Sequence, residues 1–146
     1  MSRFGTSGRH VGMDPRTSRI RLWLTAVVLA HLVISLAHGR AHGQARVPLS
    51  VAANLFVFLV ILAGPLLGLV LIRYAQRAGA WLVASTLTAS FVFGVVNHFL
   101  IAGADHVAYV DPHARALFAA TAVLLAASEG IGAALAVRLC GKRNLS

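Results

Sequence analysis

The chain carries little charge for its length and is especially poor in acidic residues. Only 12% of its 146 residues are charged, and just four are Asp or Glu. Soluble domains carry about 25% charged residues, so a chain with this composition cannot cover its surface with polar groups. The composition therefore excludes a soluble enzyme and a disordered tail as the main description of the protein.

Cysteine is equally scarce, with Cys140 as the single example. One thiol cannot form an intrachain disulfide and cannot supply a thiolate cluster for a metal. The sequence also lacks a phosphate-binding loop, a dinucleotide fingerprint and a hydrolase nucleophile elbow. A metal site in this chain would have to be built from histidine and carboxylate side chains.

Apolar residues, by contrast, are abundant and gathered into long runs. They make up 58% of the chain, and the mean hydropathy is +0.79. Each of four runs is long enough to cross a hydrocarbon core of about 30 Å, and a spanning segment must satisfy its own backbone hydrogen bonds as a helix. The sequence predicts an all-α, up-down-up-down four-helix membrane bundle over residues 20–139, between a basic flexible tail (1–19) and a short basic tail (140–146). The predicted spans are about 20–39, 49–72, 79–102 and 115–138.

Basic residues are distributed unevenly between the two sides of this bundle. Ten of the 13 lie in the N-terminal tail and its junction with the first span, after the second span, or at the C-terminus; the other side has three, Arg40, Arg46 and Arg115. The positive-inside rule then places both termini in the cytoplasm, and we expect a bacterial inner membrane with contacts to anionic lipid. Because these topology signals account for the net charge of +9, no nucleic-acid partner is expected.

A second interpretation treats residues 1–39 as a secretory signal peptide. A basic tail precedes an apolar run, and Ala37 and Gly39 could flank a cleavage site. The run is long for a signal peptide and ends in polar residues at helical spacing. Cleavage would also remove His31 and His38, so the sequence favours a retained first span.

Small residues and proline shape two of the predicted spans. Gly64, Pro65 and Gly68 predict a kink near the centre of the second span, because proline removes a helical hydrogen bond. Small residues recur every four positions along the fourth span, a spacing that lets helix backbones approach closely. They could pack against a second copy of the chain, but packing inside the bundle is favoured. They are Ala122, Ala126, Gly130 and Ala134.

Seven histidines in so apolar a chain are the main anomaly. His31, Ser35, His38 and His42 are spaced at i, i+4, i+7 and i+11, which places them on one face of the first helix. Polar groups facing lipid are costly, so this face should point into the bundle. Counting about 1.5 Å per residue from the cytoplasmic arginines puts His38 and His98 at similar depth near the outer face. In an up-down bundle these two imidazoles would face each other across the diagonal.

Imidazoles on facing helices are typical ligands of a transition-metal ion or of a bis-histidine haem b. We predict His38 and His98 as ligands, with further candidates His31, His42, Asp105 and His106. Glu129, the single acidic residue within a span, would be a proton or charge partner beneath the site. Supporting hydrogen bonds would come from Ser35, Asn54 and Asn97. The pattern does not distinguish copper, iron, zinc, nickel or cobalt from haem b.

One short stretch resembles a family of metal transporters. Ala104-Asp105-His106-Val107-Ala108 followed by Asp111 is similar to the Ala-Asp-His-x-Ala-x-x-Asp stretch of nickel/cobalt permeases. In that family another histidine precedes the Asp-His pair by five residues, whereas His98 precedes Asp105 by seven, and the permeases have about twice as many helices. The resemblance covers 8 of 146 residues and implies divalent-metal binding by His98, Asp105 and His106.

Three functions are compatible with these observations. The first is metal handling or electron transfer at the outer face, which includes a metal-dependent redox protein or a subunit of one. The second is an accessory or scaffold subunit of a larger membrane complex, in which the polar residues only hold helices together. The third is an ion or small-solute transporter that works as a homo-oligomer, since four spans are few for a monomeric carrier.

Overall fold

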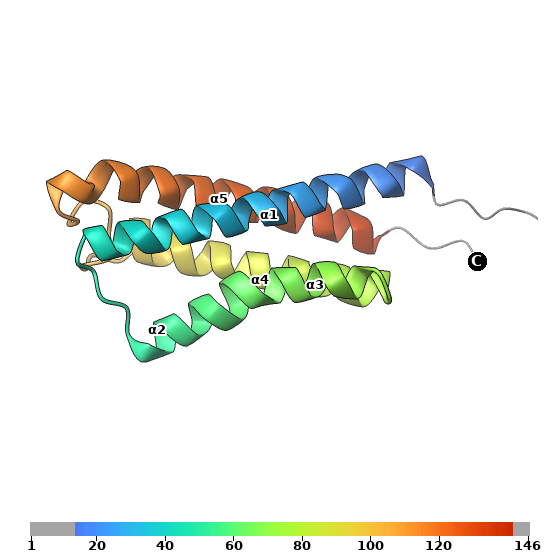
Figure 1. The fold of residues 1–146 in the computed structure, drawn as a ribbon, viewed down its shortest axis with the longest axis horizontal. Coiled ribbons are helices and arrows are strands. Elements are labelled where there is room, and N and C mark those ends of the chain that lie inside the picture. Colours follow the sequence, from blue (N-terminus) through green and yellow to red (C-terminus); the bar gives the residue numbers. More distant parts are fainter. Residues whose placement is uncertain (1–13, 142–146) are drawn as a thin grey trace, which may run out of the picture.

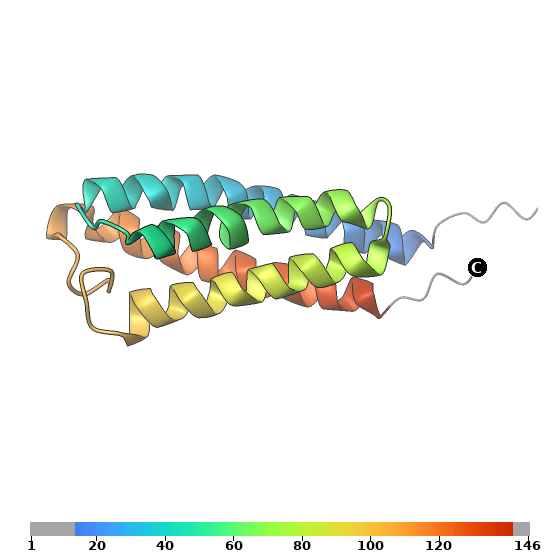
Figure 2. The same ribbon diagram turned by 90° about the horizontal axis from the view of Figure 1, so that it is seen from below.

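The structure, a computed structural model, describes residues 14–141. These residues form an all-α bundle of four antiparallel helical segments, so the predicted fold class is confirmed (Figures 1 and 2). The outermost segments in the sequence are α1 (Pro15–Gln44) and α5 (Pro112–Cys140). The second segment consists of α2 (Val51–Phe56), the π-helix η1 (Val57–Ala63) and α3 (Gly64–Ile72); the third consists of α4 (Gln76–Val95) and the π-helix η2 (Val96–Leu100). Of the two predicted tails, residues 1–13 and 142–146 lie outside the described part of the chain.

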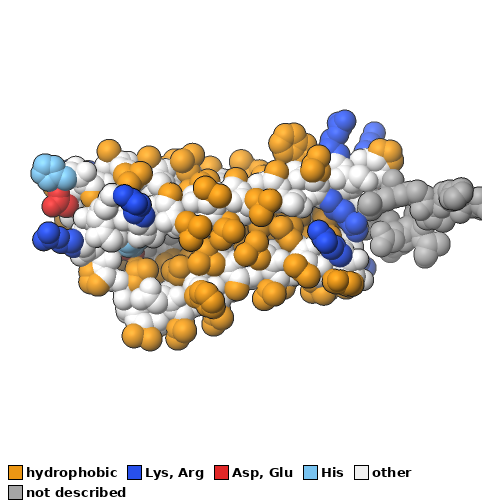
Figure 3. Space-filling view, viewed as in Figure 1, with side chains coloured by type: hydrophobic (Ala, Val, Ile, Leu, Met, Phe, Trp, Pro, Cys, Tyr) orange, Lys and Arg blue, Asp and Glu red, His pale blue; other side chains and the backbone are white. Residues whose placement is uncertain are grey.

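Helix α1 begins and α5 ends at the same end of the bundle, which we call the terminal end (Figure 1). The opposite end, formed by the connections 45–50 and 101–111, is called the loop end. All four segments are long and apolar enough to cross a membrane. Apolar side chains cover the middle of the surface, and Lys and Arg gather toward its two ends (Figure 3). The chain is therefore an integral membrane protein with a lipid-facing apolar belt.

Helices α1 and α5 both begin at an Asp-Pro pair. The Asp14 carboxylate accepts a hydrogen bond from the Arg16 N–H (3.1 Å), and the Asp111 carboxylate accepts one from the His113 N–H (2.9 Å). Proline is favoured at the first helical position because its missing N–H would have no partner there. The helix accordingly begins at Pro15, before the predicted start of the span at residue 20.

The second segment bends away from α1 toward the loop end (Figure 1). Pro65 has no N–H, so the carbonyl of Ile61 loses its α-helical donor. The helix widens into η1 at this point, and the Gly64 N–H bonds to the Leu59 carbonyl five residues earlier. The bend that the proline predicts is thus present as a π-helical stretch, and it separates α2 from α1.

The half of the bundle near the terminal end is tightly packed and apolar. Helices α3 and α4 approach so closely that a Cβ on Gly79 would lie 2.3 Å from the backbone nitrogen of Ile72. All four segments contribute buried apolar side chains to this core, among them Leu24, Val28, Ile72, Val83, Leu87 and Leu139. The buried histidines and Glu129 lie in the other half of the bundle.

The predicted stripe of small residues on α5 is only partly buried. Ala122 is buried and Ala126 is half-buried, but Gly130 and Ala134 are exposed, so the expectation that the whole stripe packs inside the bundle was wrong. A helix has 3.6 residues per turn, so positions four apart drift steadily around its surface. Gly132 makes the close contact instead, and a Cβ there would lie 2.5 Å from Cδ1 of Leu87.

Candidate metal centre

Three histidines from two segments meet near the loop end. His38 and His42 are one turn apart on α1, and His98 lies on η2. One nitrogen from each ring lies within 4.8 Å of the other two. The three residues are only 6–8% exposed. Buried imidazole nitrogens that converge from different helices could hold a metal ion.

His38 and His98 are both hydrogen-bonded to the protein through Nδ1. The Thr121 hydroxyl lies 2.8 Å from Nδ1 of His38 and 2.8 Å from the Leu117 carbonyl oxygen, so when it donates to Leu117 its oxygen accepts from Nδ1–H of His38. Nδ1–H of His98 donates to the Asp105 carbonyl oxygen (3.0 Å). His98 therefore has its free electron pair on Nε2, and His38 has its own there in the Nδ1–H tautomer, the form in which a histidine binds metal through Nε2.

The Nε2 atoms of these two rings point at each other. Nε2 of His38 and Nε2 of His98 are 3.1 Å apart. Two electron pairs at this distance repel unless a proton or a cation lies between them. With metal–nitrogen bonds of about 2.05 Å, two ligands of a tetrahedral ion are about 3.3 Å apart. The observed separation is close to that value.

His42 and the side chain of Asp105 complete the cluster. Nε2 of His42 lies 3.4 Å from Oδ1 of Asp105, and the His42 Nδ1 is buried without a hydrogen-bond partner. Asp105 Oδ1 is also buried without a hydrogen-bond partner and lies 3.7 Å from Nδ1 of His98. A carboxylate beside an imidazole N–H orients the ring and makes its other nitrogen a stronger ligand.

Phe118 lies beneath the three imidazoles. Its ring centroid is 4.9 Å from that of His38, 4.8 Å from that of His42 and 5.2 Å from that of His98. Phe118 is fully buried and packs with Ala41, Val110 and Ala114. The connection 101–111 folds back over this cluster, because the Val107 N–H donates to the His98 carbonyl (3.0 Å). The centre is thereby shielded from bulk water, which strengthens any electrostatic interaction within it.

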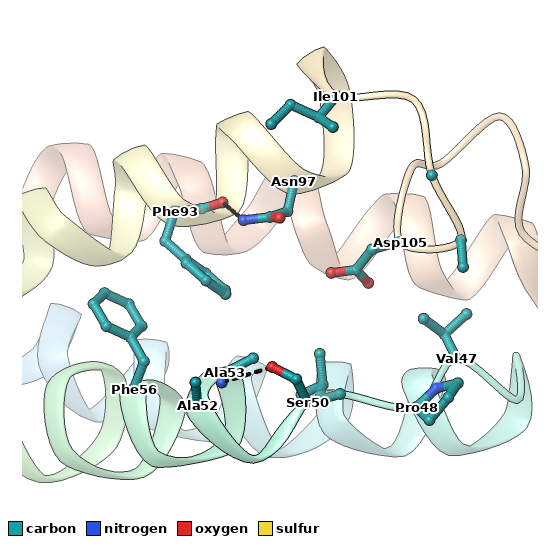
Figure 4. A pocket seen from close by; sticks show the side chains of 13 residues that line it. Val47, Pro48, Ser50, Ala52, Ala53, Phe56, Phe93, Asn97, Ile101 and Asp105 are labelled. Atoms are coloured by element: carbon teal, nitrogen blue, oxygen red, sulfur yellow. Dashed lines mark hydrogen bonds between the residues drawn. The ribbon is translucent and has the colours of Figure 1, made fainter.

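A groove between α2 and η2 leads to Asp105 (Figure 4). Phe56 and Phe93 stack across its inner end, with ring centroids 4.7 Å apart. The Asp105 and Asn97 side chains point into the space between the two helices (Figure 4). Asp105 also lines the cavity that contains the three histidines, so its side chain borders both spaces.

That inner cavity continues from the histidines toward Glu129. Its volume is about 70 Å³, enough for a few water molecules, and its polar lining includes Ser35 and Ser90. Glu129 is 2% exposed, and its Oε1 lies 4.0 Å from Nδ1 of His31. Nε2–H of His31 donates to the Ile61 carbonyl (3.2 Å), the one that Pro65 leaves without a helical donor. His31 and Glu129 therefore form a separate pair below the three-histidine cluster.

The remaining predicted site residues lie outside the cluster. His106 uses both ring nitrogens locally: Nε2–H donates to the Phe99 carbonyl (3.2 Å) and Nδ1 accepts from the Ala108 N–H (3.1 Å). Asn54 is exposed and donates to the Leu49 carbonyl, and Asn97 donates to the Phe93 carbonyl. Ser35 lies within 3.4 Å of Nε2 of His31 rather than beside a cluster histidine.

Two residues of the centre were not among the predicted site residues. Thr121 orients His38, and Phe118 contacts all three rings. Their spacing of three residues places them on one face of α5. Thr121 is a polar residue in an apolar span at the depth of His38, and this signal could have identified it. A buried phenylalanine in an apolar helix has no comparable signal.

Comparisons with protein-family models, with curated proteins and with solved structures find no match to this chain.

Proposed function

We propose that this protein binds one divalent transition-metal ion through His38, His42 and His98 and handles that ion at the face of the membrane opposite its termini. The observation that supports this most strongly is the pair of Nε2 atoms 3.1 Å apart, each on a ring that is bonded to the protein through Nδ1. Asp105 would supply the fourth ligand or orient His42 from the adjacent position. Neutral imidazoles with a carboxylate suit zinc, copper, nickel or cobalt.

The geometry favours a single ion over haem b. Axial ligands on opposite faces of a haem are about 4 Å apart with the macrocycle between them. A separation of 3.1 Å leaves no room for that plane, and the adjoining cavity of about 70 Å³ is far smaller than a porphyrin.

Access to the site supports metal handling from one side of the membrane. The groove beside α2 reaches Asp105 from the loop end, whereas the apolar core closes the half near the terminal end. With both termini in the cytoplasm, the ion would enter from the extracytoplasmic side. A site open to one side suits capture, storage or delivery of an ion to a partner better than a continuous pore.

Elemental analysis and a visible spectrum of the protein purified without added metal test this proposal. We expect about one transition-metal ion per chain and no Soret band. His38→Ala and His98→Ala should each abolish the bound metal, while the exposed His113 serves as the matched control, with His113→Ala retaining it. Metal-free wild-type protein that is unstable without another subunit would instead favour the accessory-subunit hypothesis.

A further inference from the structure

A second polar pocket lies at the terminal end, far from the histidines. It has a volume of about 190 Å³ and lies between α1 and α3, two helices that touch only sparsely. Its lining consists of two guanidinium groups, one hydroxyl and two apolar side chains: Arg21, Arg73, Thr25, Leu69 and Ile72. A pocket with two positive charges and no negative one is suited to an anion.

The Arg21 guanidinium is held in place by one hydrogen bond, which leaves most of its N–H groups available. One of its terminal nitrogens donates to the side-chain oxygen of Gln76, and Gln76 in turn donates to the Leu139 carbonyl (3.5 Å). Gln76 is only 7% exposed, so this anchor is part of the packed bundle. The Nε–H of Arg21 is buried without a hydrogen-bond partner. This buried Nε is out of reach of a ligand, so an anion in the pocket would be bound by the N–H groups of Arg21 that the bond to Gln76 leaves free.

No carboxylate of the described chain neutralises these arginines. Within residues 14–141, the close contacts between carboxylates and basic groups all involve histidines. Asp14 caps α1, while the three other acidic residues lie at the loop end or beside His31. The positive charge of the pocket is therefore available to an external anion.

Aromatic residues mark the depth of the pocket. Trp23 on α1 is 59% exposed and Tyr74, next to Arg73, is 83% exposed. Exposed Trp and Tyr side chains lie at the headgroup level of a bilayer. Phosphate at that depth belongs to lipid headgroups, and Leu69 and Ile72 offer apolar walls to the glycerol and upper acyl carbons of a lipid.

We infer that this pocket binds the phosphate of an anionic phospholipid, with Arg21 and Arg73 donating to its oxygens. This site is independent of the metal centre and of the function proposed for it. Basic pockets between membrane helices bind anionic headgroups in this way.

Native mass spectrometry of the full-length protein in neutral detergent tests the inference, with phosphatidylglycerol and phosphatidylcholine as probes. The wild type should bind one phosphatidylglycerol more tightly than phosphatidylcholine. Arg73→Gln changes an exposed side chain and should weaken phosphatidylglycerol binding roughly five-fold, and the double variant R21Q/R73Q roughly 25-fold. The matched control R40Q/R46Q removes two exposed arginines near the loop end and should leave this binding unchanged.

Three results would overturn the inference. Equal affinity for the two lipids in the wild type would show that the pocket does not select anionic headgroups. An equal loss in R40Q/R46Q would show that only net charge matters. Displacement of the lipid by inorganic phosphate at comparable concentration would show that the pocket takes a soluble phosphate. Because R73Q leaves the histidines untouched, its metal content reports separately on the function proposed above.

Discussion

His38 and His98 lie 60 residues apart in the sequence, yet their Nε2 atoms are 3.1 Å apart in the bundle. Thr121 and the Asp105 carbonyl hold the opposite nitrogens of the two rings. The protein thus fixes the orientation of each imidazole before any ion binds. Such preorganisation favours a small cation between the two rings and lowers the cost of ordering its ligands.

The hydroxyl of Thr121 should contribute to metal affinity without touching the ion. Thr121→Val keeps the shape of the side chain but removes the hydroxyl that is hydrogen-bonded to Nδ1 of His38. We expect a loss of roughly 10–100-fold in affinity, as is typical for partners of ligating histidines. Competition with a chromophoric chelator measures this change. Thr88→Val, at an exposed position of α4, is the matched control, and an equal loss there would contradict the assigned role.

The charge of Asp105 should matter more than its shape. Asp105→Asn removes the negative charge 3.4 Å from His42 Nε2 while keeping the side-chain volume. We expect affinity for a divalent ion to fall by roughly tenfold or more, because His42 loses the carboxylate that orients its ring. Asp111→Asn is a suitable control, because Asn caps a helix as well as Asp does. Unchanged affinity in the Asp105 variant would remove the carboxylate from the site.

Metal binding should weaken as the pH falls. An imidazole binds metal only in its neutral form, so protons compete with the ion for His38, His42 and His98. The apparent affinity should fall by roughly tenfold per pH unit for each ligand that must lose a proton. Equilibrium dialysis across a pH series measures the slope. An affinity that rises on acidification would contradict ligation by histidine.

The close contact of α3 with α4 should make Gly79 important for stability. A Cβ at this position would lie 2.3 Å from the Ile72 nitrogen, so Gly79→Ala must push two backbones apart. We expect the free energy of unfolding to fall by about 3 kcal/mol. Gly39→Ala is the control, because a Cβ there meets nothing within 4 Å and alanine favours the helix. Unfolding of both variants in a denaturing detergent gives the comparison, and equal stabilities would contradict the packing.

Sequence reasoning predicted the parts of the fold that depend on composition and local spacing. Long apolar runs predicted four helices, and Pro65 predicted the bend in the second segment. Residue counting placed His38 and His98 at similar depth because helical rise is nearly constant. The 3.1 Å separation of their Nε2 atoms is consistent with that expectation.

The rest of the site depends on geometry that spacing does not encode. His98 lies in a π-helix, whose altered turn changes the direction of its side chain, and nothing in the local residues predicted that turn. The connection 101–111 folds back so that Asp105 faces the cluster while His106 binds backbone groups instead. Asn54 was expected to support the site with a hydrogen bond, but the bend at Pro65 carries α2 away from the histidines.

X-ray absorption fine structure of the zinc-loaded protein tests the central claim most directly. The account predicts a first shell of about four nitrogen or oxygen ligands at about 2.0–2.1 Å, with outer-shell scattering from three imidazoles. His42→Ala should reduce the imidazole contribution to two rings. A spectrum without imidazole scattering, or one unchanged by the combined replacement of His38 and His98, would contradict the assignment of this cluster as the metal centre.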